Sequence, residues 1–503
     1  MRDLQSYLNR FLVIFELVIL LFLLIWRFKL GLIRYIDIDE FAHLHWGYNF
    51  FSGMQPYKDF LYFFPPLFLF ALAPLFAIVG KSTMILIGGR ILTFGIFLLI
   101  LGIIFLLVKK VRDNQTALLT VVILSFLPIP YDKFIELRPD TLATFFAIAG
   151  VYFLSRGLLN QLKITNWRNL FLAGFFYGLS LITLPKVVFF LLAAGVVLLI
   201  LVIRKPNSFK NLILPFLVGI LIPGIFCIAF FVWSRDFSKA VYLTTQFASD
   251  SSKVLGRKFY MFPSHFFHPN DTYYALPGVS TPLITNLLIY VIACIWGIIA
   301  FVSFLGRKTW EESIVQLLLS LTFLINLIAF IKLIPLKHAQ YFISFAPFVA
   351  FYFAEFVYSM KKLLERRGIA WLYSILFVGL IITIGVTGYR MYQIKANWNN
   401  SKTLADLDLI YKTIPSGEYV FDLVGATIFY KDPYYVCCLP YGQYEEAFSF
   451  RLPSLARSLM DTQTKYVFPY YDGRLSVLPP LDEQYIREHY TTLLTDPMIM
   501  VAK

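Results

Sequence analysis

Ionisable side chains are concentrated directly after the first hydrophobic segment of the chain. They are three carboxylates, Asp37, Asp39 and Glu40, and two imidazoles, His43 and His45. Such groups at a membrane boundary are costly and usually mark a functional site. A carboxylate is the common general base for activating a hydroxyl, so we predict that Asp39 and Glu40 are catalytic, with Asp37 in support. The alternatives are a solvated loop or a helix cap, which Asp favours, and interfacial packing for the histidines.

Cationic residues in three later connections form the second half of this pattern. They and their polar neighbours are Arg138 and Asp140, which flank Pro139, then Lys186 after Pro185, and then Lys337, His338 and Tyr341. Arginine suits bidentate recognition of phosphate or carboxylate. Cations placed where negative charge develops stabilise a departing phosphate, so the pattern fits a hydroxyl that is deprotonated while a phosphate leaves. The alternative for these cations is snorkelling to lipid headgroups or ion pairing at the end of a span.

The composition is that of a polytopic membrane protein. Of the 503 residues, 59% are hydrophobic and 15% are charged, whereas soluble domains average roughly 45–50% and about 25%. The formal net charge of +14 is spread over separate connections rather than one stripe, which argues against nucleic acid as a partner. The adjacent Cys437 and Cys438 show neither a disulfide framework nor a metal-binding spacing.

About eleven stretches are long and apolar enough to be membrane-spanning helices. They lie near 11–28, 84–108, 116–130, 141–155, 169–184, 187–203, 211–233, 283–305, 313–333, 340–359 and 370–389. The apolar stretch 60–80 contains Pro65, Pro66 and Pro74, and proline is disfavoured inside helices. We therefore predict a re-entrant or interfacial helix pair there rather than a span.

Basic residues alternate between the two sides of the predicted bundle, which gives its orientation. They occur at Arg2 and Arg10; Lys109, Lys110 and Arg112; Arg156, Lys163 and Arg168; Arg204, Lys205 and Lys210; Arg307 and Lys308; and Lys361, Lys362, Arg366 and Arg367. Basic connections favour the cytoplasmic side, so the N-terminus is predicted to be cytoplasmic. Arg34 and Lys58 fall in the first external loop instead, and indicate either snorkelling or a loop that handles an anion.

The chain divides into a membrane part and a soluble part. Residues 1–389 form the predicted transmembrane domain, with a first external loop at 29–83 and a second large one at 234–282. Residues 390–503 are more polar and predict a small extracytoplasmic α/β domain. In that domain we expect a helix over 403–413 and strands over 419–421 and 427–430.

The order and spacing of several short motifs resemble a known enzyme family. These motifs are Asp39-Glu40, the run Gly53 to Phe60, Pro65-Pro66-Leu67, Arg90, Arg138-Pro139-Asp140 and a Lys closing the fifth span. Together they resemble the bacterial relatives of protein O-mannosyltransferases, which include the lipid A aminoarabinose transferases. The resemblance covers roughly residues 1–360. It implies a C-type glycosyltransferase (GT-C) membrane fold, a polyprenyl-phosphate sugar donor used on the outer face, and inversion at the anomeric carbon.

The resemblance also implies roles for individual residues. Asp39 corresponds to the family's catalytic aspartate of the first loop, and the cations at 186 and 337–341 would face the lipid phosphate. Within the matching run, Lys58 and Asp59 are supporting residues. Relatives in the aminoarabinose branch often carry a Lys where Phe64 stands here, so Lys58 or Arg34 would have to replace that contact.

The sequence therefore predicts a multi-pass glycosyltransferase of a bacterial plasma membrane. It would move a sugar from a polyprenyl-phosphate carrier to a hydroxyl on a glycan, lipid or protein, with Asp39 as general base. No cofactor is assigned, and a divalent metal between Asp39, Asp140 and a histidine is left open. The alternatives are a transporter or flippase of an anionic lipid-linked substrate, although no internal repeat is visible, and a non-catalytic partner in polysaccharide assembly.

Overall fold

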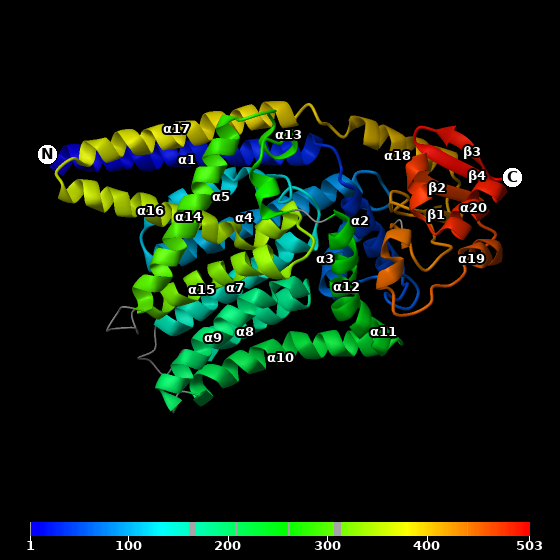
Figure 1. Cartoon of the computed structure of the whole chain (residues 1–503), viewed down its shortest axis with the longest axis horizontal. Coiled ribbons are helices and arrows are strands. Elements are labelled where there is room, and N and C mark those ends of the chain that lie inside the picture. Colours follow the sequence, from blue (N-terminus) through cyan, green and yellow to red (C-terminus); the bar gives the residue numbers. More distant parts are fainter. Residues whose placement is uncertain (1, 160–166, 207–208, 260–261, 306–312, 440) are drawn as a thin grey trace.

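A long helical bundle carries a small mixed α/β domain at one end (Figure 1). The computed structural model describes residues 2–159, 167–206, 209–259, 262–305, 313–439 and 441–503. The basic residues Lys163, Arg307 and Lys308 lie outside these described ranges. Two long helices, α1 (Arg2–Ile33) and α17 (Ala370–Lys395), run side by side along one edge of the bundle.

Nine helices of the described chain are long and apolar enough to cross a membrane. They are α1, α4 (Ile85–Val111), α7 (Pro139–Leu159), α9 (Val188–Arg204) with the turn before it from Pro185, α10 (Phe209–Trp233), α14 (Thr281–Leu305), α15 (Ile314–Ile328) with the π-helical turn after it to Leu333, α16 (Phe342–Arg366) with the turn before it from Ala339, and α17. Two shorter helices, α5 (Asn114–Phe126) and α8 (Trp167–Leu181), occupy the other two predicted spans. The polytopic helical fold is confirmed, and a helix is found at every predicted span.

The segment between α1 and α4 contains two short helices. α2 (Ile38–Phe51) follows α1 directly, and α3 (Leu67–Val79) packs against it. The expected helix pair over 60–80 is instead a single helix of 13 residues, because Pro66 caps the start of α3 and the residues before it are not helical. Pro74 lies within α3 and does not end the helix. At 13 residues α3 is too short to span a bilayer unaided.

The segment between α10 and α14 is also largely helical in its described residues. It contains α11 (Phe237–Tyr242), a π-helical turn at Leu243–Phe247, α12 (Ala248–Phe259) and α13 (Asp271–Tyr274). In Figure 1 α2, α3, α11 and α12 lie between the bundle and the C-terminal domain. These helices therefore lie at the interface between the helical bundle and the C-terminal domain.

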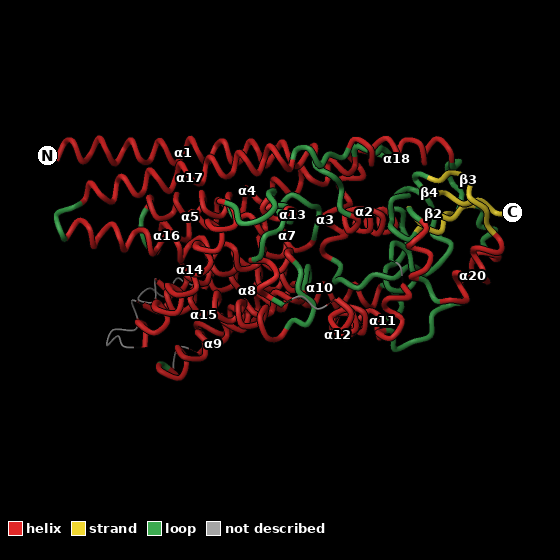
Figure 2. Tube along the Cα trace, turned by 45° about the horizontal axis from the view of Figure 1, so that its top comes forward, coloured by secondary structure: helices red, strands yellow, loops and turns green. Residues whose placement is uncertain are grey.

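The C-terminal domain contains a four-stranded mixed sheet in the order β1-β2-β4-β3 (Figure 2). β1 (Val420–Asp422) is parallel to β2 (Tyr466–Tyr470), while β4 (Met498–Ala502) is antiparallel to both β2 and β3 (Tyr490–Thr495). The helices of the domain are α18 (Ser401–Thr413), α19 (Leu455–Asp461) and α20 (Pro480–His489).

Two details of the domain differ from the sequence prediction. The boundary at 390 falls inside α17, which continues to Lys395. The helix over 403–413 and the first strand are present, but 427–430 is a turn rather than a strand. The turn forms because the Asp422 carboxylate accepts hydrogen bonds from the backbone N–H groups of Val424, Gly425 and Thr427.

Glycine allows α8 and α10 to approach until their backbones touch. A Cβ atom on Gly219 of α10 would lie 2.2 Å from the carbonyl oxygen of Phe171, and one on Gly174 of α8 would lie 1.9 Å from that of Phe216. Small residues allow this kind of close packing between membrane helices. This contact holds α8 and α10 together on one side of the bundle.

We expect Gly219→Ala to destabilise the protein by about 1–3 kcal/mol, because the new methyl group meets backbone that cannot move without separating the helices. The thermal midpoint of the detergent-solubilised protein measures this loss. Gly224→Ala on the same helix is the matched control, since a Cβ there meets nothing within 4 Å. Equal midpoints for the two variants would contradict the packing argument.

Candidate active site

The first turn of α2 is fixed by a reciprocal cap. The carboxylate of Asp37 accepts a hydrogen bond from the N–H of Asp39 at 3.0 Å, and Glu40 accepts one from the N–H of Asp37 at 3.0 Å. This capping box satisfies donors that a helix start leaves free. It leaves the side chain of Asp39, which is 53% exposed, directed away from the cap.

Glu40 is buried in a two-pronged ion pair with Arg90 of α4. The guanidinium donates to the two carboxylate oxygens at 2.6 and 2.9 Å, and both side chains are 1% exposed. Glu40 also accepts the N–H of Leu137 at 3.0 Å. Its oxygens are thereby fully used in joining α2, α4 and the segment before α7, and Glu40 does not line the cavity described below.

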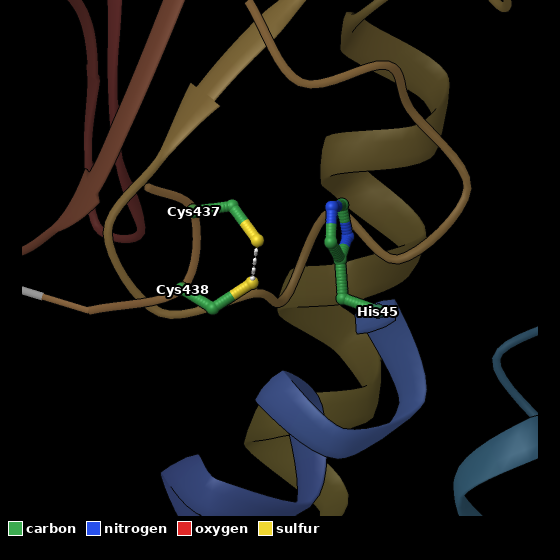
Figure 3. A group of neighbouring side chains, drawn as sticks. All are labelled: His45, Cys437 and Cys438. Carbon is green, nitrogen blue, oxygen red and sulfur yellow. Dashed lines mark hydrogen bonds between the residues drawn. The ribbon is translucent and has the colours of Figure 1, made fainter. Parts of the chain in front are cut away.

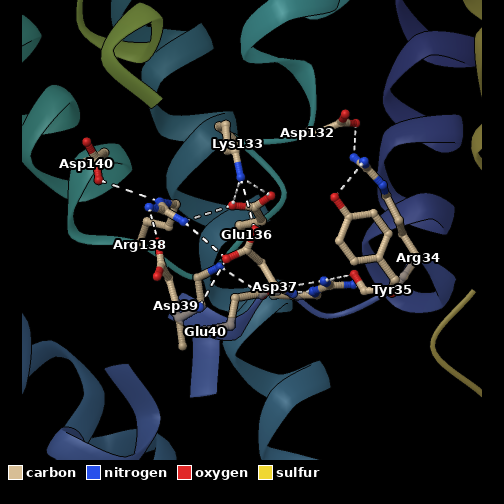
Figure 4. A network of polar contacts seen from close by, with 12 residues as sticks. Arg34, Tyr35, Asp37, Asp39, Glu40, Asp132, Lys133, Glu136, Arg138 and Asp140 are labelled. Carbon is tan, nitrogen blue, oxygen red and sulfur yellow. Dashed lines mark hydrogen bonds and ion pairs between the residues drawn. The ribbon is translucent and has the colours of Figure 1, made fainter. Parts of the chain in front are cut away.

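Arg138 lies among four carboxylates (Figure 4). Its guanidinium nitrogens lie 2.5 Å from Asp39, 3.1 Å from Glu136, 3.7 Å from Asp37 and 3.9 Å from Asp140. Its side chain is only 6% exposed. A buried arginine requires such compensation, because an unpaired charge in the interior is strongly unfavourable.

Two lysines complete this ionic network. Lys133 contacts Glu136 at 2.7 Å and Asp37 at 3.2 Å. Lys186 pairs with Asp140, and its ammonium lies 4.2 Å from the centre of the Tyr341 ring. The Lys186 side chain is 22% exposed, so its ammonium group is paired with Asp140 but also remains accessible from solvent.

A cavity of about 1020 Å³ joins these groups. The charged part of its wall comes from the first turn of α2, residues 132–140 and Lys186, and the segment 333–341 adds His338 and Tyr341. Another part of the lining is neutral and rich in hydroxyl groups; it includes Thr244, Thr245, Ser249, Ser251, Ser252, Gln443 and Tyr444. The aromatic side chains Trp46, Phe63, Phe64 and Phe247 also line it. One cavity therefore combines a carboxylate, cations, hydroxyl groups and aromatic surface.

Burial and neighbouring charge shift the protonation of this wall. Burial alone would raise the pKa of Asp37, but Lys133 and Arg138 hold it well below its usual range. Burial raises the pKa of Glu136 to about 7. Burial lowers the pKa values of His43 and His338 to about 4, so both imidazoles are neutral at pH 7. His338 can thus donate a hydrogen bond there but adds no positive charge.

Most of the predicted site residues meet at this cavity. Asp37, Asp39, Arg138, Asp140, Lys186, His338 and Tyr341 all line it. Lys58, Asp59 and Lys337 do not: Lys58 and Asp59 contact each other at 3.5 Å, and Lys337 donates to the carbonyl oxygen of Ile334. The catalytic role predicted for Glu40 is untested, and its buried pair with Arg90 fits a positioning role.

Sequence reasoning missed several residues of the wall. Lys133 and Glu136 stand in the polar run before Arg138 and form an i,i+3 pair, a spacing that could have singled them out. Arg34, a predicted substitute for the family's missing lysine, does line the cavity but pairs with Asp132. Gln443 and Tyr444 come from the C-terminal domain and had no sequence signal.

A divalent metal between Asp39, Asp140 and a histidine does not fit this wall. Asp39 is engaged by Arg138, and Asp140 by Lys186. His43 is packed among the aromatic rings of Trp46, Phe64 and Phe68. The carboxylates that would bind a cation are therefore already neutralised by the protein's own cations.

The comparisons with known proteins agree with this architecture. Residues 64–233 match the model of the dolichyl-phosphate-mannose-protein mannosyltransferase family. ArnT from Cupriavidus metallidurans is similar over 98% of both chains, with 12% identity and TM-scores of 0.56 bound to undecaprenyl phosphate and 0.58 in the apo state. The chain thus has the GT-C fold of ArnT, and its residues 64–233 match the mannosyltransferase family model.

An archaeal enzyme shares the GT-C fold as well. The Archaeoglobus fulgidus oligosaccharyltransferase tethered to an acceptor peptide matches over 95% of this chain and 72% of its own, with 11% identity and a TM-score of 0.54. No curated protein matches the sequence itself. At these identities the structural matches establish the fold, while the family match covers Arg138 and Lys186 but begins after Asp39.

Glu136 makes the stability of this GT-C protein depend on pH. Its folded pKa of about 7 lies above the ordinary value of 4.5, so the folded protein keeps a proton that the unfolded chain has lost. The free energy of unfolding should then fall as pH rises from about 4.5 to about 7 and level off above that. We expect the thermal midpoint to fall over the same range, and Glu136→Gln to remove that component.

Glu418→Gln is the matched control for this prediction, because Glu418 lies in the C-terminal domain, away from the cavity lining, and pairs with the exposed Lys465. It should retain the wild-type profile. The histidines and lysines of the site are common to all three proteins, so the difference between the profiles isolates Glu136. A Glu136→Gln profile parallel to that of the wild type would contradict the raised pKa.

Proposed function

We propose that this protein transfers a sugar from a polyprenyl-phosphate carrier to an acceptor hydroxyl, with Asp39 as the general base. The observation that carries the proposal is the position of Asp39, half exposed on a cavity that also holds Arg138 and Lys186. The GT-C fold and its similarity to ArnT bound to undecaprenyl phosphate support a lipid-linked donor.

Asp39 has the geometry that a base requires. One carboxylate oxygen is engaged by Arg138 at 2.5 Å, which holds the side chain in place. At 53% exposure the rest of the carboxylate is accessible to an incoming hydroxyl. Its neighbours Asp37 and Glu40 are turned into the capping box, so Asp39 is the carboxylate of this turn that is free to accept a proton.

The leaving phosphate would be stabilised by the cationic side of the same wall. Arg138 and Lys186 supply charge, and the neutral His338 and the Tyr341 hydroxyl supply hydrogen bonds. Each cation is paired with a carboxylate in the ligand-free arrangement, so the phosphate would replace Asp140 as a partner of Lys186. Lys186 is the better candidate for this exchange because its side chain is more exposed than that of Arg138.

The proposed step is a single displacement at the anomeric carbon. The acceptor O–H gives its proton to the Asp39 carboxylate, the acceptor oxygen forms a bond to the anomeric carbon, and the bond from that carbon to the phosphate oxygen breaks. The electron pair of that bond leaves with the lipid phosphate. Attack from the face opposite the phosphate inverts the configuration of the sugar.

The neutral wall would receive the acceptor. Its threonine, serine, glutamine and tyrosine side chains come from the π-helical turn, α12 and residues 443–444. Uncharged hydroxyl and amide groups bind sugar hydroxyls without attracting a second phosphate. We place the site on the outer face of a bacterial plasma membrane, since the basic connections lie at the other ends of the helices.

Asp39→Asn should lower kcat by about 10²–10⁴-fold, because the amide cannot accept the proton. Transfer from a defined polyprenyl-phosphate sugar by purified protein is the measurement. Asp59→Asn is the control in the same external segment, since Asp59 does not line the cavity, and it should remain active. Wild-type activity of Asp39→Asn would refute the assigned base, whereas movement of the carrier across vesicles without sugar release would favour a transporter.

Lys186→Met should weaken binding of polyprenyl phosphate by about ten- to a hundredfold, since a hydrogen bond to a charged group contributes about 1.5–3 kcal/mol. Binding of the sugar-free carrier can be titrated directly, which separates this loss from catalysis. Lys58→Met removes a cation that lies off the cavity and should bind like the wild type. Equal affinities for the two variants would exclude Lys186 from the phosphate site.

A further inference from the structure

A second cluster of reactive side chains lies where α2 meets the C-terminal domain, outside the cavity. It consists of His45 on α2 and the adjacent Cys437 and Cys438. Figure 3 shows the two sulfur atoms side by side, with the imidazole of His45 facing them across the interface. One ligand atom from each residue lies within 4.8 Å of the other two, and all three side chains are buried.

We propose that His45, Cys437 and Cys438 form a structural zinc site that clamps the C-terminal domain onto α2. Thiolate and imidazole are the usual ligands of structural Zn²⁺. The carboxylate of Asp432, which lies 2.9 Å from Nε2 of His45, is the fourth donor. The ion would replace the proton that His45 and Asp432 share, and the two thiols would release their protons on binding.

The backbone is arranged to bring the two thiols together. Neighbouring side chains of an extended segment point to opposite sides, so adjacent cysteines do not normally share a ligand. Cys438 has a φ of +70°, a left-handed conformation that is uncommon for a residue other than glycine. With this conformation the sulfur atoms lie 2.7 Å apart on one side of the chain. Such outliers are retained mainly at functional sites.

The surrounding loop is held in place independently of any ion. The Asp422 carbonyl accepts the N–H of Cys438 at 3.0 Å, while the Asp422 carboxylate organises the turn at Gly425. A Cβ on Gly425, whose φ is +83°, would lie 3.0 Å from Cα of Ala42 and 3.1 Å from Sγ of Cys438. The loop therefore touches α2 one turn before His45, which places the thiols within reach of the imidazole.

The distances are close to those that zinc imposes. Bonds of about 2.0–2.3 Å in a tetrahedral site separate the ligand atoms by about 3.4–3.8 Å. Zinc binding would require the sulfur atoms, now 2.7 Å apart, to part by about 1 Å and the imidazole, within 4.8 Å of them, to approach. Asn49 donates to Asp432 at 2.6 Å and holds the carboxylate in place, as outer partners do at metal sites.

The test is the metal content of the full-length protein in detergent. We expect one equivalent of zinc per chain by elemental analysis, and after chelation and reloading with Co²⁺ we expect a thiolate-to-cobalt charge-transfer band. Cys437→Ser and Cys438→Ser should lose both signals. Cys227→Ser and Cys294→Ser are the matched controls, because these cysteines lie on α10 and α14, and they should keep both.

Asp432→Asn should weaken zinc binding by about 10–100-fold while leaving the thiols in place. Chelation should also lower the thermal midpoint of the wild type. Three results would overturn the proposal: no stoichiometric zinc in the reduced wild-type protein, zinc that persists in the Cys437→Ser and Cys438→Ser double variant, or a wild-type mass two hydrogens low with both thiols unreactive, which would identify a disulfide instead. All these readouts are independent of sugar transfer.

Discussion

The Glu40–Arg90 ion pair fixes the geometry on which the candidate site depends. Glu40 joins its own helix cap, α4 and the N–H of Leu137. Arg90 in turn donates to the carbonyl oxygens of Gly31, Arg34 and Tyr35 at 3.2, 2.7 and 2.6 Å. A buried guanidinium and a buried carboxylate tolerate no separation, because either one alone would be an uncompensated charge. The start of α2 and the segment before α7 are thereby held together, and Asp39 is placed against Arg138.

The charged side chains that line the cavity also have to compensate one another's charge. The carboxylates of Asp37, Asp39, Glu136 and Asp140 face the cations of Lys133, Arg138 and Lys186. With Glu136 protonated below a pH of about 7, the four carboxyl groups carry three charges and balance three cations. An anion can therefore enter only by exchanging with a carboxylate. Such exchange would make anion binding selective, because an anion that interacts weakly with the cation does not compensate for the free energy of the broken ion pair.

The sequence predicted the bundle well because membrane spans require long apolar runs, and each such run became a helix. Of the residues predicted for the site, Asp39, Arg138 and Lys186 line the cavity, and they stand out in the sequence because charges next to apolar segments are rare. Lys337 and Lys58 do not line it, because their side-chain direction depends on local backbone that composition does not encode. The roles of all five remain predictions. The turn at 427–430 was read as a strand because its β-branched and aromatic residues have strand propensity, and only the contact with Asp422 reveals the turn. Cys437 and Cys438 carried no signal, since their approach to His45 depends on a contact between segments almost 400 residues apart.

The family match covers only part of the cavity lining. It contains Arg138 and Lys186, but it begins after Asp39 and ends before the π-helical turn, α12, the segment 333–341 and the C-terminal domain. A phosphate presents the same charge whatever sugar it carries, so the residues that bind it can stay constant while the acceptor changes. The hydroxyl-rich lining that we propose receives the acceptor has no such constraint, and it is built partly from a domain docked onto α2, the helix that carries Asp39. Whatever fixes that docking, including the contact of Gly425 with Ala42, also sets the distance between the proposed base and the acceptor.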